Sequence, residues 1–383
     1  MAEHVQLLVG TTKGAFLINA ADDRSSWAVT GPYCGGCPIN HLAADPKTGT
    51  IWAGGGGDWD GAVVWRSVDG GSEWDPCQLT RGTKDRWAAE DAEFAEMIGW
   101  TDAPLPFEDD FQQIWSLGFH HDKLFAGAKP ATLLVSSDGG QSFEKVSSLT
   151  DDPAAKDWNP GAAGLTLHTL EFDPADPNKI WVGISAAGVF ASEDGGTSWE
   201  RRNRMSNATG CPDQSADPAA PSGGETGLCV HNMVRANAAG DILYQQNHQG
   251  VWRSTNGGRS WDDITHGLPS TFGFPIRVHP QKPEMIWTIP LNGDDAGRFP
   301  PDAAAAVWRS TDAGETWEAM REGLPQEACY FTVLRQAMAV DQHEAVGLYF
   351  GTNSGSIFAS FDEGQSWSEI VRHLPTILSV ETA

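Results

Sequence analysis

The chain has 383 residues, with 25 lysines and arginines against 51 aspartates and glutamates, and its formal net charge is −26. A chain this acidic repels phosphate backbones and anionic lipid, so we expect neither nucleic-acid nor membrane binding. No apolar run has the length of a membrane span or a secretory signal. We therefore expect a cytoplasmic protein whose six cysteines are mostly reduced.

A short box recurs along the chain and predicts its architecture. Each copy begins with Ser, carries Asp or Asn and glycine, and ends on an aromatic residue; the copies lie at 67–74, 137–143, 192–199, 254–261, 310–317 and 360–367, with a degenerate copy at 22–27. The closing aromatics recur about every 50–60 residues, a period typical of propeller blades. Asp and Asn accept hydrogen bonds from nearby backbone N–H groups, and glycine allows positive φ, so each box is predicted to be a tight turn.

The predicted strands occur in groups of four, taken here in chain order. The first group is incomplete, with three strands at 5–9, 14–18 and 27–30. Complete groups follow at 42–79, 114–149, 168–199, 230–264, 276–320 and 331–371. The last segment, 377–382, alternates like a strand and belongs to no group of its own. The sequence thus predicts one all-β domain over 1–383, a seven-bladed β-propeller of four-stranded antiparallel blades, closed by the C-terminal strand in the first blade.

Long insertions between these strands gather on one predicted face of the ring. Segments 80–110, 150–164, 203–229 and 265–275 connect successive blades, 291–306 lies within a blade, and one helix is expected at 87–99. The boxes lie on the opposite face. Because long loops in a compact domain often carry function, we expect a ligand site where the loop-rich face meets the central channel.

Histidines on the predicted innermost strands are the first candidates for that site. His168 and His231 occupy equivalent positions in neighbouring blades, His41 is close to the same position, and His248 lies just after a second strand. Converging imidazoles bind zinc or a similar divalent transition metal, or serve as acid and base. The alternative is that each satisfies local hydrogen bonds. The metal hypothesis names His41, His168 and His231.

Three arginines are candidates for an anionic ligand. Arg277 and Arg335 lie on inner strands, and Arg298 lies in the 291–306 loop with Asp294 and Asp295. Arginine suits a carboxylate or phosphate group. The alternative is internal pairing, in which Arg298 and its neighbouring aspartates only rigidify the loop.

The boxes resemble the Asp-box, or BNR, repeats of sialidases, sortilin-like receptors and the bacterial group labelled WD40/YVTN/BNR-like or exo-alpha-sialidase. Four further segments look like that bacterial group: 165–169, 229–231, 244–248 with Asn247 and His248, and 289–295 with Asn292. The resemblance implies a β-propeller. It does not imply sialidase activity, because the arginine motif of those enzymes is missing and only Tyr330, of four tyrosines, lies near a channel arginine.

Two cysteine pairs allow more than one interpretation. Cys34 and Cys37 form a C-x-x-C that His41 could join as a zinc ligand, and Cys211 and Cys229 bracket an insertion. Separate reduced thiols are the favoured interpretation for all of them.

Two functions fit these features. The first is a small-molecule site in the channel at the loop-rich face, with a metal-assisted hydrolase or lyase acting on a carboxylate-bearing or sugar-like substrate. In that hypothesis His41, His168 and His231 are catalytic groups or metal ligands, while the arginines, with Asn247, His248, Asn292, the two aspartates and Tyr330, bind substrate. The second is a non-catalytic platform that binds a protein partner with the same face.

Overall fold

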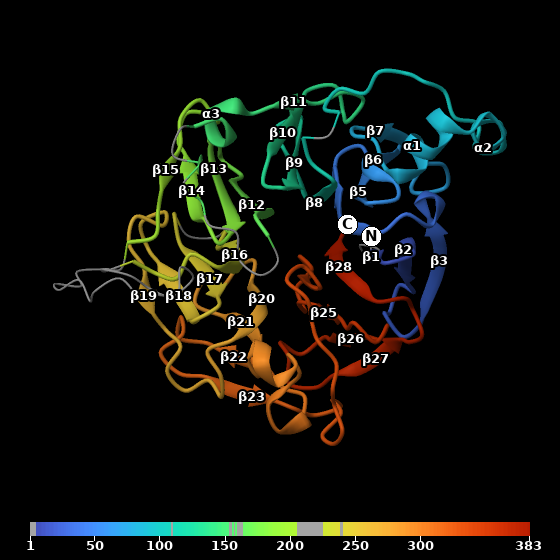
Figure 1. The fold of residues 1–383 in the computed structure, drawn as a ribbon. Coiled ribbons are helices and arrows are strands. Elements are labelled where there is room, and N and C mark those ends of the chain that lie inside the picture. Colours follow the sequence, from blue (N-terminus) through green and yellow to red (C-terminus); the bar gives the residue numbers. More distant parts are fainter. Residues whose placement is uncertain are drawn as a thin grey trace.

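The computed structural model describes residues 5–108, 110–152, 155–156, 158, 164–204, 225–237 and 240–383. Its strands follow one another around a central axis, and residues 7–11 pair with residues 377–382, so segments near the two ends of the chain lie side by side (Figure 1). Among the described residues, no helix has the length and apolar character needed to cross a membrane. The architecture is a β-propeller of antiparallel four-stranded blades.

Five sheets contain four strands each. The first contains the C-terminal strand and has the order β28 (Ile377–Thr382), β1 (Gln6–Thr11), β2 (Gly14–Ala20), β3 (Trp27–Tyr33). The others are β12 (Thr166–Asp173), β13 (Asp176–Ser185), β14 (Gly188–Ser192), β15 (Glu200–Arg201); β16 (Val230–Arg235), β17 (Leu243–Asn247), β18 (Gly250–Ser254), β19 (Asp262–Asp263); β20 (Gly273–Val278), β21 (Ile286–Pro290), β22 (Val307–Ser310), β23 (Glu318–Met320); and β24 (Met338–Val340), β25 (Leu348–Gly351), β26 (Ile357–Ser360), β27 (Ser368–Val371).

The remaining eight strands form one sheet. They are β4 (Ile39–Ala44), β5 (Ile51–Gly57), β6 (Gly61–Ser67), β7 (Asp75–Gln78), β8 (Gln113–His120), β9 (Lys123–Lys129), β10 (Leu133–Ser136) and β11 (Glu144–Lys145). Each half has the order of a blade, and the halves join through one antiparallel pair, Gly56 with Gln113. The prediction of seven separate four-stranded blades is therefore wrong in this respect: five sheets are separate blades, and the segments expected as the second and third share a sheet.

The boxes form the turns between third and fourth strands, as predicted. In all six, the Ser hydroxyl donates to the Asp or Asn side chain. In each box the backbone N–H of a glycine donates to the same Ser hydroxyl oxygen. In the second box this Ser is Ser136, one residue earlier than predicted. Hydrogen bonds from Ser198 and Ser192 lower the pKa of Asp194 to about 2, so the carboxylate is the form that the turn holds.

Buried tryptophans join neighbouring blades to the boxes. The indole N–H of Trp181, on β13, donates to the Gly257 carbonyl of the next box at 2.9 Å. Trp52 and Trp287 make the same contact with the boxes that follow them. All three side chains are buried. In these three boxes the repeated turn is thus structural, because it supplies an acceptor that a buried indole of the preceding blade would otherwise lack.

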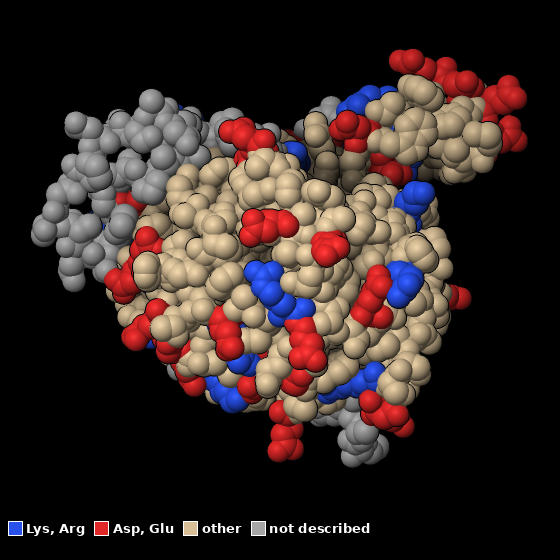
Figure 2. Space-filling model, turned by 90° about the horizontal axis from the view of Figure 1, so that it is seen from below, with Lys and Arg blue, Asp and Glu red and all other residues tan. Residues whose placement is uncertain are grey.

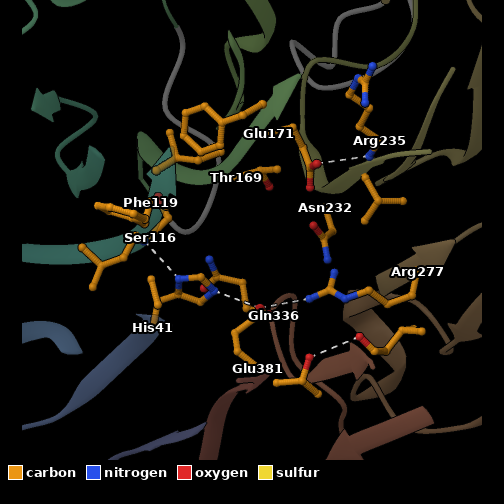
Figure 3. A pocket seen from close by; sticks show the side chains of 18 of the residues that line it. His41, Ser116, Phe119, Thr169, Glu171, Asn232, Arg235, Arg277, Gln336 and Glu381 are labelled. Atoms are coloured by element: carbon orange, nitrogen blue, oxygen red, sulfur yellow. Dashed lines mark hydrogen bonds and ion pairs between the residues drawn. The ribbon is translucent and has the colours of Figure 1, made fainter. Parts of the chain in front are cut away.

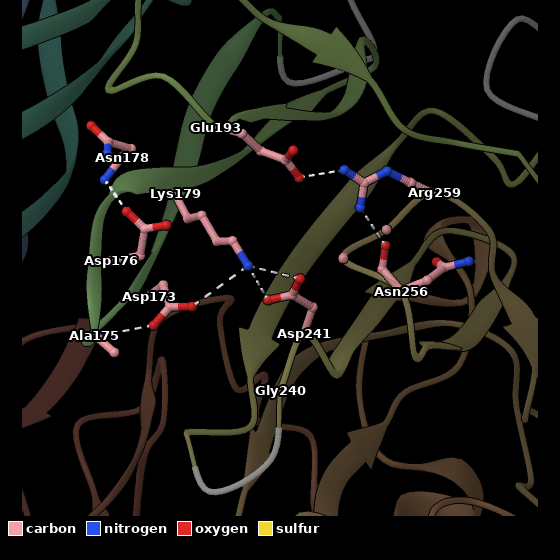
Figure 4. Close-up of polar contacts among 12 residues, drawn as sticks. Asp173, Ala175, Asp176, Asn178, Lys179, Glu193, Gly240, Asp241, Asn256 and Arg259 are labelled. Carbon is pink, nitrogen blue, oxygen red and sulfur yellow. Dashed lines mark hydrogen bonds and ion pairs between the residues drawn. The ribbon is translucent and has the colours of Figure 1, made fainter.

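Ion pairs link adjacent blades on the face that carries the boxes. The Lys179 ammonium lies 3.0 Å from both carboxylate oxygens of Asp241, and the Arg259 guanidinium contacts Glu193 (Figure 4). Such half-exposed pairs contribute little stability individually, about 0.2–1 kcal/mol. Their effect is to fix the relative position of the two blades.

The helical insertion contains two short helices rather than the single helix expected at 87–99. They are α1 (Thr83–Glu90) and α2 (Ala92–Ile98), and a further short helix, α3 (Ser147–Thr150), precedes the next blade. Asp91 separates the first two because its carboxylate accepts from the backbone N–H groups of Glu93 and Phe94 and so begins α2.

The visible surface of the propeller in Figure 2, seen at a right angle to the view of Figure 1, carries acidic side chains spread among fewer basic ones.

Candidate functional site

A cavity of about 360 Å³ lies on the axis of the ring. Its walls come from the innermost strands β4, β8, β12, β16, β20 and β28 and from residues around β24, so every sheet contributes to it. Most lining residues belong to the C-terminal halves of these strands, and Asn237, Pro280 and Gln342 come from the turns that follow them. The cavity therefore reaches the face of the short turns and boxes. The expected site in the channel at the loop-rich face stays a prediction.

Amide side chains close the inner end of the cavity. Asn232 Nδ2 donates to the Arg335 carbonyl at 2.6 Å, and Gln336 Nε2 donates to the His168 carbonyl at 2.6 Å. These contacts join strands from blades that are not neighbours. Both amide side chains line the cavity.

Glu171 is the most perturbed acid of the cavity. It lies on β12, and its Oε2 accepts from the backbone N–H of Arg235 at 3.2 Å. Burial raises the pKa of Glu171 to about 7, against the opposing effects of Arg277 and of this hydrogen bond. Glu381 raises it further. A glutamic acid with this pKa can give or take a proton near neutral pH.

Glu381 lies across the cavity in a different environment (Figure 3). Its Oε1 is 3.3 Å from Nη2 of Arg277 and 3.1 Å from Nε2 of His41. The other ring nitrogen of His41, Nδ1, accepts from the backbone N–H of Leu117 at 3.0 Å, so Nε2 carries the hydrogen that Glu381 accepts. Glu381 is thus a carboxylate held between two donors, whereas Glu171 has one.

His168 lines the cavity but is fully engaged in local hydrogen bonds. Its Nδ1 lies 2.8 Å from the Thr169 hydroxyl, and its Nε2 lies 2.8 Å from the Val230 carbonyl. Burial, with a smaller effect from Arg335, lowers the pKa of His168 to about 3, so the ring is neutral. The structure therefore does not bring His41, His168 and His231 together as one metal-ligand set.

His231 and His248 lie instead on the loop-rich side, where many of the other predicted residues gather. Their ring centroids are 5.5 Å apart, and Nε2 of His248 lies 3.9 Å from Oδ2 of Asp294. Among the described residues, one group of three His, Cys, Asp or Glu side chains has its ligand atoms within 4.8 Å of one another: Cys229, His231 and His248.

The three candidate arginines are divided between these two places. Arg277 lines the axial cavity. Arg335 and Arg298 flank the ring of Phe274, at 4.9 Å and 5.7 Å from its centroid, and Arg298 pairs with Asp294. The alternative interpretation, internal pairing of Arg298, is present, and the three arginines are not brought together in one place.

Most of the remaining residues predicted to bind substrate contact other parts of the protein. Asn247 is buried, and its Oδ1 accepts from the backbone N–H groups of Gln249 and Gly250. Asn292 closes its loop by accepting from the Phe299 N–H at 2.8 Å. Tyr330 is exposed and packs edge-on against Phe299, and Asp295 is exposed in the same loop.

The cysteines form no disulfide among the described residues. Cys34 and Cys37 are buried, and burial raises the pKa of Cys37 to about 12, so both are inert thiols. His41 faces Glu381 and does not join them. Cys211 lies outside the described residues, so its pairing with Cys229 stays a prediction.

Glu171 and Glu381 are the residues that sequence reasoning missed. Both lie within predicted strands, at 168–199 and 377–382. Glu171 stands three residues after His168, a spacing that places the two side chains on opposite faces of a regular strand, so alternation gave no signal for it.

No protein-family model matches the chain. The chain is 26% identical over 225 residues to an oligoxyloglucan-reducing end-specific xyloglucanase of Emericella nidulans, in a match that covers 52% of this chain and 26% of that protein. It is 28% identical over 240 residues to a xyloglucanase of Hypocrea jecorina, covering 55% of this chain and 25% of that protein. The chain thus spans about a quarter of the length of the curated relatives it matches.

A solved structure supports the fold. An ancestral GH74 enzyme matches with a TM-score of 0.56 at 17% identity, over 90% of this chain and 40% of that one. At this identity the likeness establishes the β-propeller architecture and no more.

Proposed function

We propose that the axial cavity is the site of a glycoside hydrolase that acts on a glucan-type oligosaccharide. The observation that carries the proposal is the pair Glu171 and Glu381, two glutamates of one cavity in unlike surroundings. Hydrolysis of a glycosidic bond commonly requires such a pair, one carboxyl group that donates a proton and one that is ionised. The curated relatives are xyloglucanases, which favours a sugar substrate of this class.

Each glutamate has a defined role in the proposed reaction. Glu171 gives its proton to the glycosidic oxygen as the bond from that oxygen to the anomeric carbon breaks. In one route Glu381 takes a proton from the water that attacks the anomeric carbon. In the other route Glu381 itself bonds to the anomeric carbon; water then displaces Glu381 from that carbon and gives its proton to the ionised Glu171. Arg277 and His41 are positioning residues, since both donate to Glu381 and fix its carboxylate.

The metal-assisted chemistry expected from the three histidines is not part of this proposal. The ring nitrogens of His41 and His168 already have partners in Glu381, Leu117, Thr169 and Val230. The proposed reaction uses carboxyl groups alone.

The C-terminal strand has two roles in the proposal. β28 pairs with β1 from Leu7–Thr382 to Thr11–Ile377, and it also carries Glu381 into the cavity. We infer that this strand closes the ring and completes the site at once. Loss of the strand would therefore remove a catalytic group as well as a part of the sheet.

Hydrolysis of xyloglucan oligosaccharides, followed by the release of reducing ends, tests the proposal. We expect turnover by the wild type and a loss of about 10²–10⁴-fold in kcat for Glu171→Gln and for Glu381→Gln. Glu144→Gln, an exposed glutamate of the outer strand β11, is the matched control and should retain full activity. Thermal unfolding of each variant distinguishes a lost group from a lost fold.

Two outcomes would contradict the proposal. One is turnover that survives both substitutions in the cavity. The other is a wild type that neither binds nor hydrolyses xyloglucan or other glucan oligosaccharides.

A further inference from the structure

A cysteine and two histidines form a compact cluster on the loop-rich side, away from the axial cavity. Cys229 lies just before β16, His231 lies on that strand, and His248 follows β17. Their sulfur and nitrogen ligand atoms lie within 4.8 Å of one another. None of the three lines the axial cavity, so the proposed hydrolysis does not use them.

The orientation of His231 presents a ligand atom to this cluster. Its Nδ1 lies 2.6 Å from the Gly273 carbonyl, which can only accept, so Nδ1 carries the hydrogen. Nε2 is then the unprotonated nitrogen, and it lies 3.7 Å from Sγ of Cys229. A backbone carbonyl that fixes one ring nitrogen while the other faces a metal is the usual arrangement for a histidine ligand.

The surroundings hold one histidine and leave the other accessible. His231 is buried and packs against the rings of Phe272 and Phe274, with centroids 5.1 Å and 4.8 Å away. The side chain of His248 is 33% exposed, so an ion or a small ligand can approach from solvent on that side. His231 is therefore a fixed ligand and His248 an accessible one, an arrangement that suits a preorganised site that solvent ions can reach.

We propose that Cys229, His231 and His248 bind a transition-metal ion of the zinc type and leave one coordination position open. Thiolate and imidazole ligands select zinc and its neighbours over magnesium or calcium, which prefer oxygen. Three protein ligands with a free fourth position are characteristic of zinc sites that bind water or substrate, whereas purely structural sites usually have four.

Nearby charges act in both directions on such an ion. Arg335 interacts electrostatically with Cys229 and His231, and a cation there opposes a second cation. The thiolate that binds the ion carries one negative charge, and Asp294 adds another, with its Oδ2 3.9 Å from Nε2 of His248. Arg298 pairs with Asp294, so the two negative groups offset the two arginines, and the metal ion is held by its ligand bonds.

The test is zinc titration of tag-free protein in competition with a chromophoric chelator, paired with cobalt substitution. We expect one zinc per chain and, with cobalt, a thiolate-to-metal charge-transfer band. Cys229→Ser should abolish that band and weaken zinc binding at least about 10-fold, and His248→Ala should weaken it similarly, because even outer partners of metal ligands have effects of about 10–100-fold. His248 is accessible, so its removal should not prevent folding.

Matched controls are Cys77→Ser and His266→Ala, since Cys77 lies on the distant strand β7 and His266 is exposed. Equal zinc binding by all four variants would overturn the proposal, as would a wild type that binds no zinc. Glu171→Gln should bind zinc normally, so failure of the metal site and failure of the hydrolase proposal give different results.

Discussion

Two glutamates in one cavity differ because of what surrounds each carboxyl group. Glu171 is half-buried, and its desolvation raises its pKa to about 7 although one backbone N–H donates to its carboxylate and opposes that effect. Glu381 has a guanidinium and an imidazole within 3.3 Å and 3.1 Å. Differences of this kind assign acid and base roles at neutral pH without any change in residue type.

The pH dependence of hydrolysis follows from the raised pKa of Glu171. A general acid must be protonated, and Glu171 is protonated below about pH 7 and ionised above it. We predict that kcat/KM falls as pH rises through about 7, approaching a tenfold loss per pH unit, and that Arg277→Gln shifts this limb to higher pH because Arg277 lowers the pKa of Glu171. A pH–rate profile measures both effects, and a wild-type rate that stays constant from pH 6 to 9 would argue against Glu171 as the acid.

The sequence predicted part of this site, for a physical reason. His41, His168 and Arg277 were assigned to inner strands, and all three line the cavity. Glu171 was missed because strict alternation puts residues three apart on opposite faces of a strand. The register of β12 shifts between Leu167 and Thr169, and this bulge lets His168 and Glu171 line the same cavity.

At the scale of elements, three of the boxes connect neighbouring blades, because each accepts a hydrogen bond from an indole of the preceding blade. Their turn chemistry was predictable because Ser, Asp and glycine each have local reasons to occupy a tight turn. The indole contacts that join a box to the preceding blade could not be predicted, because they link residues that are far apart in sequence, such as Trp181 and Gly257. The single pair that merges two blades, Gly56 with Gln113, is likewise a tertiary contact with no local pattern.

Trp181→Ala tests the role of these indoles. The side chain is fully buried and its N–H has a carbonyl acceptor, so we predict a loss of about 3–5 kcal/mol in the free energy of unfolding, measured with urea. Trp87→Ala is the matched control, because Trp87 is 56% exposed, and it should cost about 0.5–1 kcal/mol. Equal losses in the two variants would show that burial between blades is not what makes Trp181 important.

The C-terminal strand offers a second test at this scale. Ile377 is fully buried at the start of β28, so Ile377→Ala should destabilise the protein by about 2–5 kcal/mol. Ile98→Ala, on α2, removes a side chain that is 40% exposed and should cost about 0.5 kcal/mol. If both variants unfold at the same urea concentration as the wild type, β28 does not stabilise the ring.

At the scale of the molecule, a ring of blades brings distant residues to one axis. Glu171 and Glu381 lie 210 positions apart in the sequence, and no local pattern indicates that they share a cavity. The propeller and its single repeated architecture were predictable from the boxes. The face of the propeller on which the cavity opens was not predictable, because the long insertions lie on one face and the cavity reaches the opposite face.

The most direct measurement of the central claim is a crystal structure of the Glu381→Gln variant with a xyloglucan oligosaccharide bound. We predict that the sugar lies in the axial cavity, with a glycosidic oxygen within hydrogen-bond distance of the Glu171 carboxyl group and the anomeric carbon facing residue 381. An oligosaccharide bound at the loop-rich face, with the axial cavity free of sugar, would contradict the account.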